Sequence, residues 1–127
     1  NTKTPLHFMV TARFHNVVDM ENCAEGIADK KIIKKFIKTI AKTIEMKIIK
    51  GPIMAQGVEE NPGLSCLAIV DFSHISIHTF TKGVIREALI DIFSCKAYDR
   101  KLVLEVCTKF FAGPNTNIRQ KEVWWGK

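Results

Sequence analysis

Residues 64–80 read LSCLAIVDFSHISIHTF, and this stretch decides the fold. Its first part, Leu64–Asp71, is a run of strand length that is apolar on both faces of the expected strand. Its second part, His74–Phe80, alternates, which places histidine and serine on one face and isoleucine on the other. A strand that is apolar on both sides needs cover on both sides. We therefore expect helices over one face of the sheet and a second sheet, from a second subunit, over the other.

Two helices and several further strands are expected around this pair. Apolar residues recur at helical spacing in 30–45, with Asp29 as the N-cap and lysines on the opposite side. A second helix is expected at 100–111, capped by Asp99. The other expected elements are a strand at 5–14, a connector at 15–28 with a short helical turn near 20–24, a strand at 46–56 interrupted by Gly51-Pro52, a polar loop at 57–63, a strand at 88–95 and a strand-like tail.

The fold class that follows from this order is α+β. The chain runs from strand to helix, through several strands, to a second helix and the tail, without a long βαβ alternation. We predict a two-layer sandwich in which an antiparallel sheet carries two helices on one face. The 127 residues fit a single domain, 1–127, and are enough to bury a core.

Composition narrows the class of protein. A hydrophobic content of 46% with 25% charged residues is typical of a globular chain rather than a disordered one. No apolar run is long enough to span a bilayer, and the first residues do not resemble a secretory signal. The four cysteines form no CxxC pair and show no zinc spacing. We therefore expect reduced thiols in a cytoplasmic protein that does not bind a membrane.

The positive charge is local. The chain has a net charge of +6, and six lysines lie on the helix expected at 30–45: Lys30, Lys31, Lys34, Lys35, Lys38 and Lys42. No aromatic residues interleave with them on the polar face, and no nucleic-acid motif accompanies them. A solvated helix face is the simpler interpretation, so we expect no nucleic-acid partner. A basic module that binds an anionic partner such as nucleic acid stays open as an alternative.

Ser73 and the two histidines of the polar face support three hypotheses. The histidines can be structural or solvated, as histidines on a half-exposed strand usually are. A zinc site at His74 and His78 would need a third and a fourth ligand, which the sequence does not indicate, so no metal is expected. A hydrolase triad of Ser73, His78 and Asp91 would lack the glycine pattern of a nucleophile elbow.

Two motifs follow each other closely. The first is Ser73–Thr79, SHISIHT, and the second is Ala88–Cys95, ALIDIFSC. Together they resemble the short prokaryotic S-adenosylmethionine decarboxylases, with good agreement over residues 60–96 and agreement in element order on both sides. The resemblance implies a homodimer in which two sheets pack face to face with helices outside, a four-layer αββα sandwich. That arrangement would supply the second sheet expected above.

The resemblance also implies a pyruvoyl-dependent decarboxylase of S-adenosylmethionine, which serves polyamine and spermidine biosynthesis. In that family a serine cleaves the chain before itself and becomes a pyruvoyl group, whose ketone condenses with the substrate amine and accepts electrons as carbon dioxide leaves. Mapped onto this sequence, Ser73 is the pyruvoyl precursor, and the bond between Phe72 and Ser73 breaks. Ser65 and His78 match the processing serine and histidine of the family. Cys95 matches its catalytic thiol, which acts as a proton donor.

One geometric condition accompanies this mapping. Ser73 and His78 have opposite parity along a regular strand, so their side chains would lie on opposite faces. They converge only if Ser73 lies outside the regular ladder, in a turn or a bulge.

Two positions depart from the family pattern and support alternatives. Phe72 stands where the family has glutamate, and Lys82 stands where it has a glutamate of the nucleoside-binding region. One alternative is an unprocessed, catalytically inactive homologue that binds a small ligand or a partner chain. Another is a family member that decarboxylates arginine or ornithine.

Overall fold

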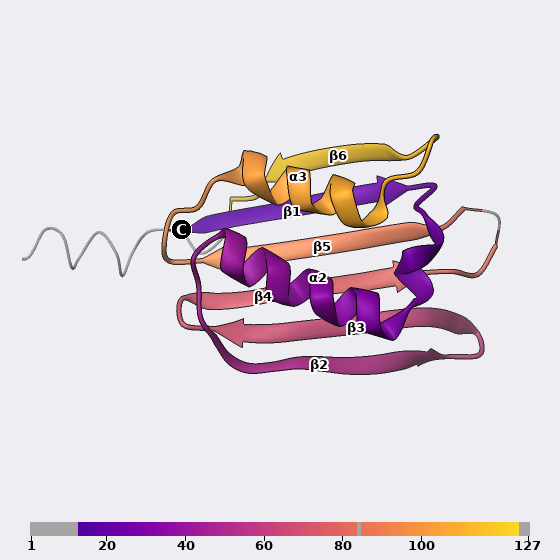
Figure 1. The fold of residues 1–127 in the computed structure, drawn as a ribbon, viewed down its shortest axis with the longest axis horizontal. Helices are drawn as coiled ribbons and strands as arrows, with labels where there is room; N and C mark the ends of the chain where they lie inside the picture. The colour runs from indigo at the N-terminus through magenta and orange to yellow at the C-terminus, as the bar shows by residue number, and fades with distance from the viewer. Residues whose placement is uncertain (1–12, 84, 125–127) are drawn as a thin grey trace, which may run out of the picture.

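The structure is a computed structural model that describes residues 13–83 and 85–124. Its elements are β1 (Phe14–Glu21), a 3-10 helix η1 (Glu25–Ala28), α2 (Lys30–Thr43), β2 (Ile48–Val58), β3 (Asn61–Val70), β4 (Ser73–Phe80), β5 (Glu87–Ser94), α3 (Arg100–Phe111) and β6 (Asn117–Glu122). The strands form one antiparallel sheet in the order β2-β3-β4-β5-β1-β6. Helices α2 and α3 lie together over one face of it (Figure 1). The predicted α+β class, with two helices on one face, is confirmed.

The core lies between the sheet and the helices. The strands alternate, and their buried side chains pack against the apolar stripes of the two helices. The central strands contribute Cys66, Ala68, Val70, Ile75, Ile77, Ile90 and Ile92, and the helices contribute Ile33, Phe36, Ile37, Ile40, Val103, Cys107 and Phe111. A tilted aromatic contact joins the helices where they meet, since the ring centroids of Phe36 and Phe111 are 4.7 Å apart.

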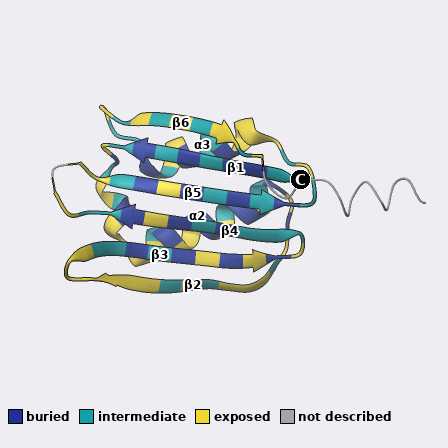
Figure 2. Ribbon diagram, turned by 180° about the vertical axis from the view of Figure 1, so that it is seen from behind, coloured by how far each residue is buried: buried dark blue, intermediate teal, exposed yellow. Residues whose placement is uncertain are grey.

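The opposite face of the sheet, called the open face below, is not covered by any described element (Figure 2). It carries the polar residues of β4 and a group of exposed apolar side chains. Leu67, Ile69 and Leu89 are 40%, 44% and 41% exposed, although they lie in the middle strands of the sheet. An exposed apolar patch at the centre of a sheet is typical of a surface that receives a partner.

Both helices begin at the predicted caps. The Asp29 carboxylate accepts hydrogen bonds from the backbone N–H groups of Lys31 and Ile32 at 2.8 and 3.2 Å. Asp99 accepts one from Lys101 at 2.8 Å. These contacts satisfy donors that the first turn leaves without a helical partner, which explains the sharp helix starts. None of the described helices is long and apolar enough to cross a membrane.

The prediction of a connector at 15–28 is wrong for its first half, where β1 runs from Phe14 to Glu21. Polar residues occur on both faces of this strand, so the alternation was hidden. Val18 and Met20 face the helices, whereas Val17 and Asp19 face the open side. Pairing with β5 over the full length of β1 outweighs the weak local pattern. Residues 5–12 of the strand predicted at 5–14 lie outside the described residues.

The prediction of a polar loop at 57–63 is also wrong. Strands β2 and β3 form a long hairpin that turns at Glu59-Glu60, so most of this segment belongs to the sheet. Gly63 has a positive φ of 138°, and a Cβ there would lie 2.0 Å from the Thr79 carbonyl oxygen. Glycine is therefore required by the close approach of β4, and it does not mark a loop here.

Candidate active site

Ser73 begins β4 directly after the turn Asp71-Phe72, at one end of the sheet. Its neighbour on β5 is Ser94, and Cys95 follows at the end of that strand. The backbone N–H of Cys95 donates a hydrogen bond to the carbonyl oxygen of Phe72 at 3.1 Å. The carbonyl before Ser73 and the residue Cys95 are thus joined directly.

Ser65 and His78 form a second group on the open face. They are cross-strand partners on β3 and β4, and Ser65 Oγ lies 2.8 Å from His78 Nδ1. Both side chains are reachable from solvent in the single chain. A hydroxyl hydrogen-bonded to an imidazole is an arrangement that can transfer protons.

The two groups lie far apart within one chain. His78 is five positions after Ser73 along β4, which corresponds to about 16 Å at the rise of an extended strand. Ser73 adjoins the turn, but it is the first residue of the ladder, paired with Val70 on β3 and with Ser94 on β5, and not outside it. The turn does not bring Ser73 and His78 together in one chain.

A third cluster was not predicted. The Asp91 carboxylate oxygen Oδ1 lies 2.9 Å from His15 Nε2 and 3.2 Å from His74 Nε2. The three residues come from β1, β4 and β5, and they lie on the open face. His15 and Asp91 are 76 residues apart, so only the strand order of the folded sheet reveals their contact. The alternation of β4 and β5 could have paired His74 with Asp91, but it could not have added His15.

Asp91 is held as an anion by this cluster. Partial burial alone would raise the pKa of its carboxyl group. The hydrogen bonds from His74 and His15 outweigh burial, and the net result is a pKa below the ordinary value.

These contacts bear on two of the hypotheses drawn from the residues. The hydrolase triad of Ser73, His78 and Asp91 is not assembled, because His78 pairs with Ser65 while Asp91 pairs with His15 and His74. Across residues 13–83 and 85–124, no three His, Cys, Asp or Glu side chains converge as metal ligands. His74 and His78 lie about 13 Å apart along β4 and cannot share a metal.

The four cysteines are all free and differ in burial. Burial raises the pKa of the Cys23 thiol to about 11 and that of the Cys107 thiol to about 12, and it also raises the pKa of Cys66. These three thiols remain protonated in the core at neutral pH. Cys95 is partly exposed and follows Ser94, the cross-strand neighbour of Ser73, so it is the cysteine that a small molecule can reach.

The open face also carries a cavity of about 380 Å³ between β1, β5 and β4. Its lining combines the apolar side chains of Val17 and Leu89 with the polar groups of Ser76, His78 and Asp91. A few polar groups in an apolar lining are typical of small-molecule sites. A partner sheet over the open face would close this cavity.

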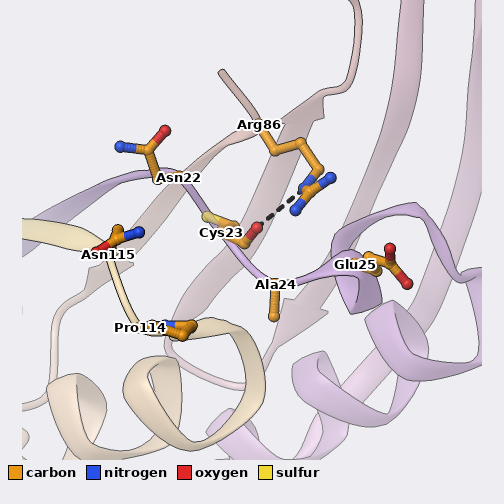
Figure 3. Close-up of a pocket in the computed structure, with 8 residues that line it drawn as sticks. Asn22, Cys23, Ala24, Glu25, Arg86, Pro114 and Asn115 are labelled. Atoms are coloured by element: carbon orange, nitrogen blue, oxygen red, sulfur yellow. Dashed lines mark hydrogen bonds between the residues drawn. The ribbon is translucent and has the colours of Figure 1, made fainter. Parts of the chain in front are cut away.

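A larger hollow, of about 510 Å³, lies at the other end of the sheet (Figure 3). Asn22, Glu25, Arg86 and Asn115 stand around it, and the Arg86 guanidinium donates a hydrogen bond to the Cys23 carbonyl at 3.0 Å. It is remote from Ser73, because β4 and β5 run the length of the sheet between them. We assign the candidate site to the open face and not to this hollow.

The two residues that depart from the family pattern have local roles. Phe72 is partly buried against the core, and the Lys96 ammonium lies 5.4 Å from the centroid of its ring. Lys82 is exposed and donates a hydrogen bond to the Glu60 carbonyl at 3.3 Å, at the end of β4 opposite to Ser73.

The comparisons with protein families and with solved structures agree with each other. A sequence model of the S-adenosylmethionine decarboxylase family matches residues 14–122. Among solved structures, the chain is similar to the adenosylmethionine decarboxylase from Aquifex aeolicus VF5, with a TM-score of 0.69 and 17% sequence identity. The match covers 92% of this chain and 97% of that one, so the two share the whole fold.

Proposed function

Because this chain belongs to the S-adenosylmethionine decarboxylase family, we propose that it is a pyruvoyl-dependent decarboxylase of S-adenosylmethionine that cleaves itself between Phe72 and Ser73. The observation that carries the proposal is the hydrogen bond from the Cys95 N–H to the Phe72 carbonyl oxygen. This carbonyl is the group that the Ser73 hydroxyl would attack. The residues present therefore fit the origin of a pyruvoyl group at Ser73.

The cleavage chemistry follows from these contacts. When Ser73 Oγ bonds to the Phe72 carbonyl carbon, negative charge develops on the oxygen that the Cys95 N–H already contacts. Collapse breaks the C–N bond, the proton of the Ser73 hydroxyl passes to the leaving nitrogen, and an ester remains between Phe72 and Ser73. Loss of the Ser73 α-proton and of the ester oxygen then releases the Phe72 carboxylate. Water replaces the nitrogen by oxygen, with release of ammonia, and the second fragment begins with a ketone.

In the decarboxylation itself, the pyruvoyl ketone supplies an electron sink for the electrons released with carbon dioxide. The chain's own residues must orient the substrate and return a proton to its α-carbon. We assign that proton to the thiol of Cys95, which is partly exposed and directly follows Ser94, the neighbour of Ser73 on β5.

Ser65 and His78 require a second copy of the chain in this proposal. Within one chain they lie about 16 Å from Ser73, too far for proton transfer. If two open faces stack about a two-fold axis, the partner's Ser65 and the partner's His78 can reach Ser73 from the facing sheet. The exposed Leu67, Ile69 and Leu89 would become the apolar centre of that interface. We therefore propose a homodimer with sites shared between protomers.

The mass of the chain under denaturing conditions tests the proposal. We expect two fragments, 1–72 and 73–127, the second lighter by one ammonia than a fragment that starts with serine. A Ser73→Ala chain serves as the matched control and should stay intact and folded. An uncut wild-type chain would overturn the pyruvoyl assignment, and a cut Ser73→Ala chain would show that another residue is the nucleophile.

A second candidate function differs only in the substrate. Lys82 places an ammonium where the family has a carboxylate of the nucleoside-binding region, which favours a substrate other than S-adenosylmethionine. Release of carbon dioxide from S-adenosylmethionine, arginine and ornithine, each added to the cleaved protein, distinguishes the two. A chain that stays uncut and releases none from any of them would favour an unprocessed, catalytically inactive homologue that binds a small ligand or a partner chain.

A further inference from the structure

The cluster around Asp91 has no part in the chemistry proposed so far. Asp91 Oδ1 receives hydrogen bonds from two imidazoles, His15 Nε2 at 2.9 Å and His74 Nε2 at 3.2 Å. Three neighbouring strands are therefore tied together by one carboxylate oxygen. A buried or half-buried anion needs such partners, and two of them are present.

Phe93 completes the cluster. The His15 ring packs on it edge to face, with centroids 5.6 Å apart, and the His74 ring lies against it at 6.0 Å. The His74 ring is thus fixed by a hydrogen bond at Nε2 and by an aromatic contact on its plane. His15 is almost fully buried, so this side of the cluster is rigid.

The position of His74 in the chain links the cluster to the bond that would break. His74 directly follows Ser73 in the chain. Its side chain is the first after the turn to form a hydrogen bond on the open face, with Asp91. On the other side of the bond between Phe72 and Ser73, the Cys95 N–H holds the Phe72 carbonyl. The peptide bond that would break is therefore fixed from both directions, by separate groups.

We infer that Asp91 is a positioning residue for self-cleavage, which acts through His74 on the orientation of Ser73. The inference rests on the proposed function and gives Asp91 and His74 a role in cleavage that the proposal above does not assign to them. After cleavage the same contacts hold His74, which then carries the new chain end, at the edge of the site.

Two single variants, their double variant and one matched control test this role. Asp91→Asn keeps the shape of the side chain but removes its charge, and His74→Phe keeps a ring against Phe93 but removes the donor. Loss of a hydrogen bond to a charged group should slow cleavage about tenfold or more. Glu21→Gln is the control. Like Asp91→Asn, it turns a carboxylate on the open face into an amide, but Glu21 lies on β1 and forms an ion pair with Arg119, away from the site. This control should cleave at the wild-type rate.

The double variant Asp91→Asn/His74→Phe separates positioning from general damage. If Asp91 acts through His74, the double variant cleaves no more slowly than the slower single variant. Multiplied effects would overturn the role assigned to Asp91. Thermal melting of each variant shows whether the chain is folded at the temperature of the assay.

Hydroxylamine identifies the step that is slowed. It splits an ester at Ser73 but leaves the peptide bond intact, so variants blocked before the acyl shift should release no fragments when it is added. Fragments released by hydroxylamine would place the block after the shift and contradict a role in orienting Ser73. If the Asp91→Asn chain cleaves as fast as the wild type, this inference alone is overturned. If the wild-type chain itself stays uncut, the proposed function is overturned with it.

Discussion

Cys95 contributes two different groups to the proposed site, and substitution can separate them. Its backbone N–H contacts the Phe72 carbonyl, and its side chain carries the thiol. A Cys95→Ala chain keeps the N–H, so it should still cleave into two fragments. Without the proton donor, the kcat for release of carbon dioxide should fall by about 10²–10⁴-fold. Fragment masses and carbon dioxide release measure the two effects in one preparation.

A buried cysteine provides the control for this prediction. Cys66 faces the helices and has a raised pKa because it is buried. Cys66→Ala should lower the stability of the chain but leave kcat unchanged. Full turnover in Cys95→Ala would remove the thiol from the mechanism.

Asp91 should make the stability of the chain depend on pH. Its pKa in the folded state lies below the ordinary value of 3.8, because the hydrogen bonds from His74 and His15 outweigh burial. A lowered pKa contributes stability above the unfolded pKa, and this contribution is lost as the pH falls through the folded pKa. The side chain is 38% exposed, so the contribution should be about 1 kcal/mol or less.

Urea unfolding of wild type and Asp91→Asn, measured between pH 7 and pH 3, tests this dependence. The wild type should be more stable at pH 7, and the difference should shrink below about pH 4 as Asp91 becomes protonated in both states. A difference that stays constant down to pH 3 would contradict the assigned ionisation.

At the level of elements, the lysine face of α2 should cost stability. None of the ion pairs found among the described residues involves a lysine of α2, and Lys34, Lys38 and Lys42 follow each other at intervals of one turn. Like charges at this spacing repel, and opposite charges attract, by about 0.2–0.5 kcal/mol per pair. Lys38→Glu exchanges two repulsive pairs for two attractive ones, so it should stabilise the chain by about 1 kcal/mol at low salt.

Salt separates this effect from a change in helix propensity. At 1 M salt the screening length falls to about 3 Å, so most of the gain from Lys38→Glu should disappear. Lys38→Gln, which removes the charge without adding another, should give about half of the gain. An equal gain at low and high salt would show that charge is not the cause.

The helices were predictable because their signals are local. Asp29 and Asp99 cap the first turns, and the apolar stripe of α2 repeats at helical spacing, so both start points were found. β1 was missed because Asn16 faces the core while Val17 faces the open side, which breaks the apolar alternation. Its strand character comes from pairing with β5 and β6, and no short window of sequence contains that information.

The residues proposed for the site stay predictions, and the sequence did not reveal how they are arranged. The family resemblance points to Ser65, Ser73, His78 and Cys95, and the alternation of β4 places its histidines on the open face. Which of these residues meet depends on the register of three strands. The sequence contains no signal for the contact of His15 with Asp91, because the residues become neighbours only when β1 inserts between β5 and β6.

For the molecule as a whole, the proposed dimer can be tested with two leucines of equal exposure. Leu67 on the open face is 40% exposed, and Leu102 on α3 is 39% exposed. Leu67→Asp would bury a charge between the two sheets, so the chain should sediment as a monomer and lose self-cleavage. Leu102→Asp adds the same charge on the helix side and should leave the dimer and cleavage intact.

Equal behaviour of the two leucine variants would contradict packing through the open face. A wild-type chain that sediments as a monomer and still cleaves itself would exclude sites shared between protomers.

The distance between Ser73 and the pair formed by Ser65 and His78 has a genetic consequence. A Ser73→Ala chain and a His78→Ala chain would each be inactive alone, because every site in either homodimer lacks one component. In a mixed dimer, one site combines Ser73 of the His78→Ala chain with His78 of the Ser73→Ala chain, so this site has both components. Co-expression of the two defective genes should therefore restore about a quarter of the wild-type sites by random pairing in a two-fold dimer. Two alleles that each fail alone would complement each other within one protein.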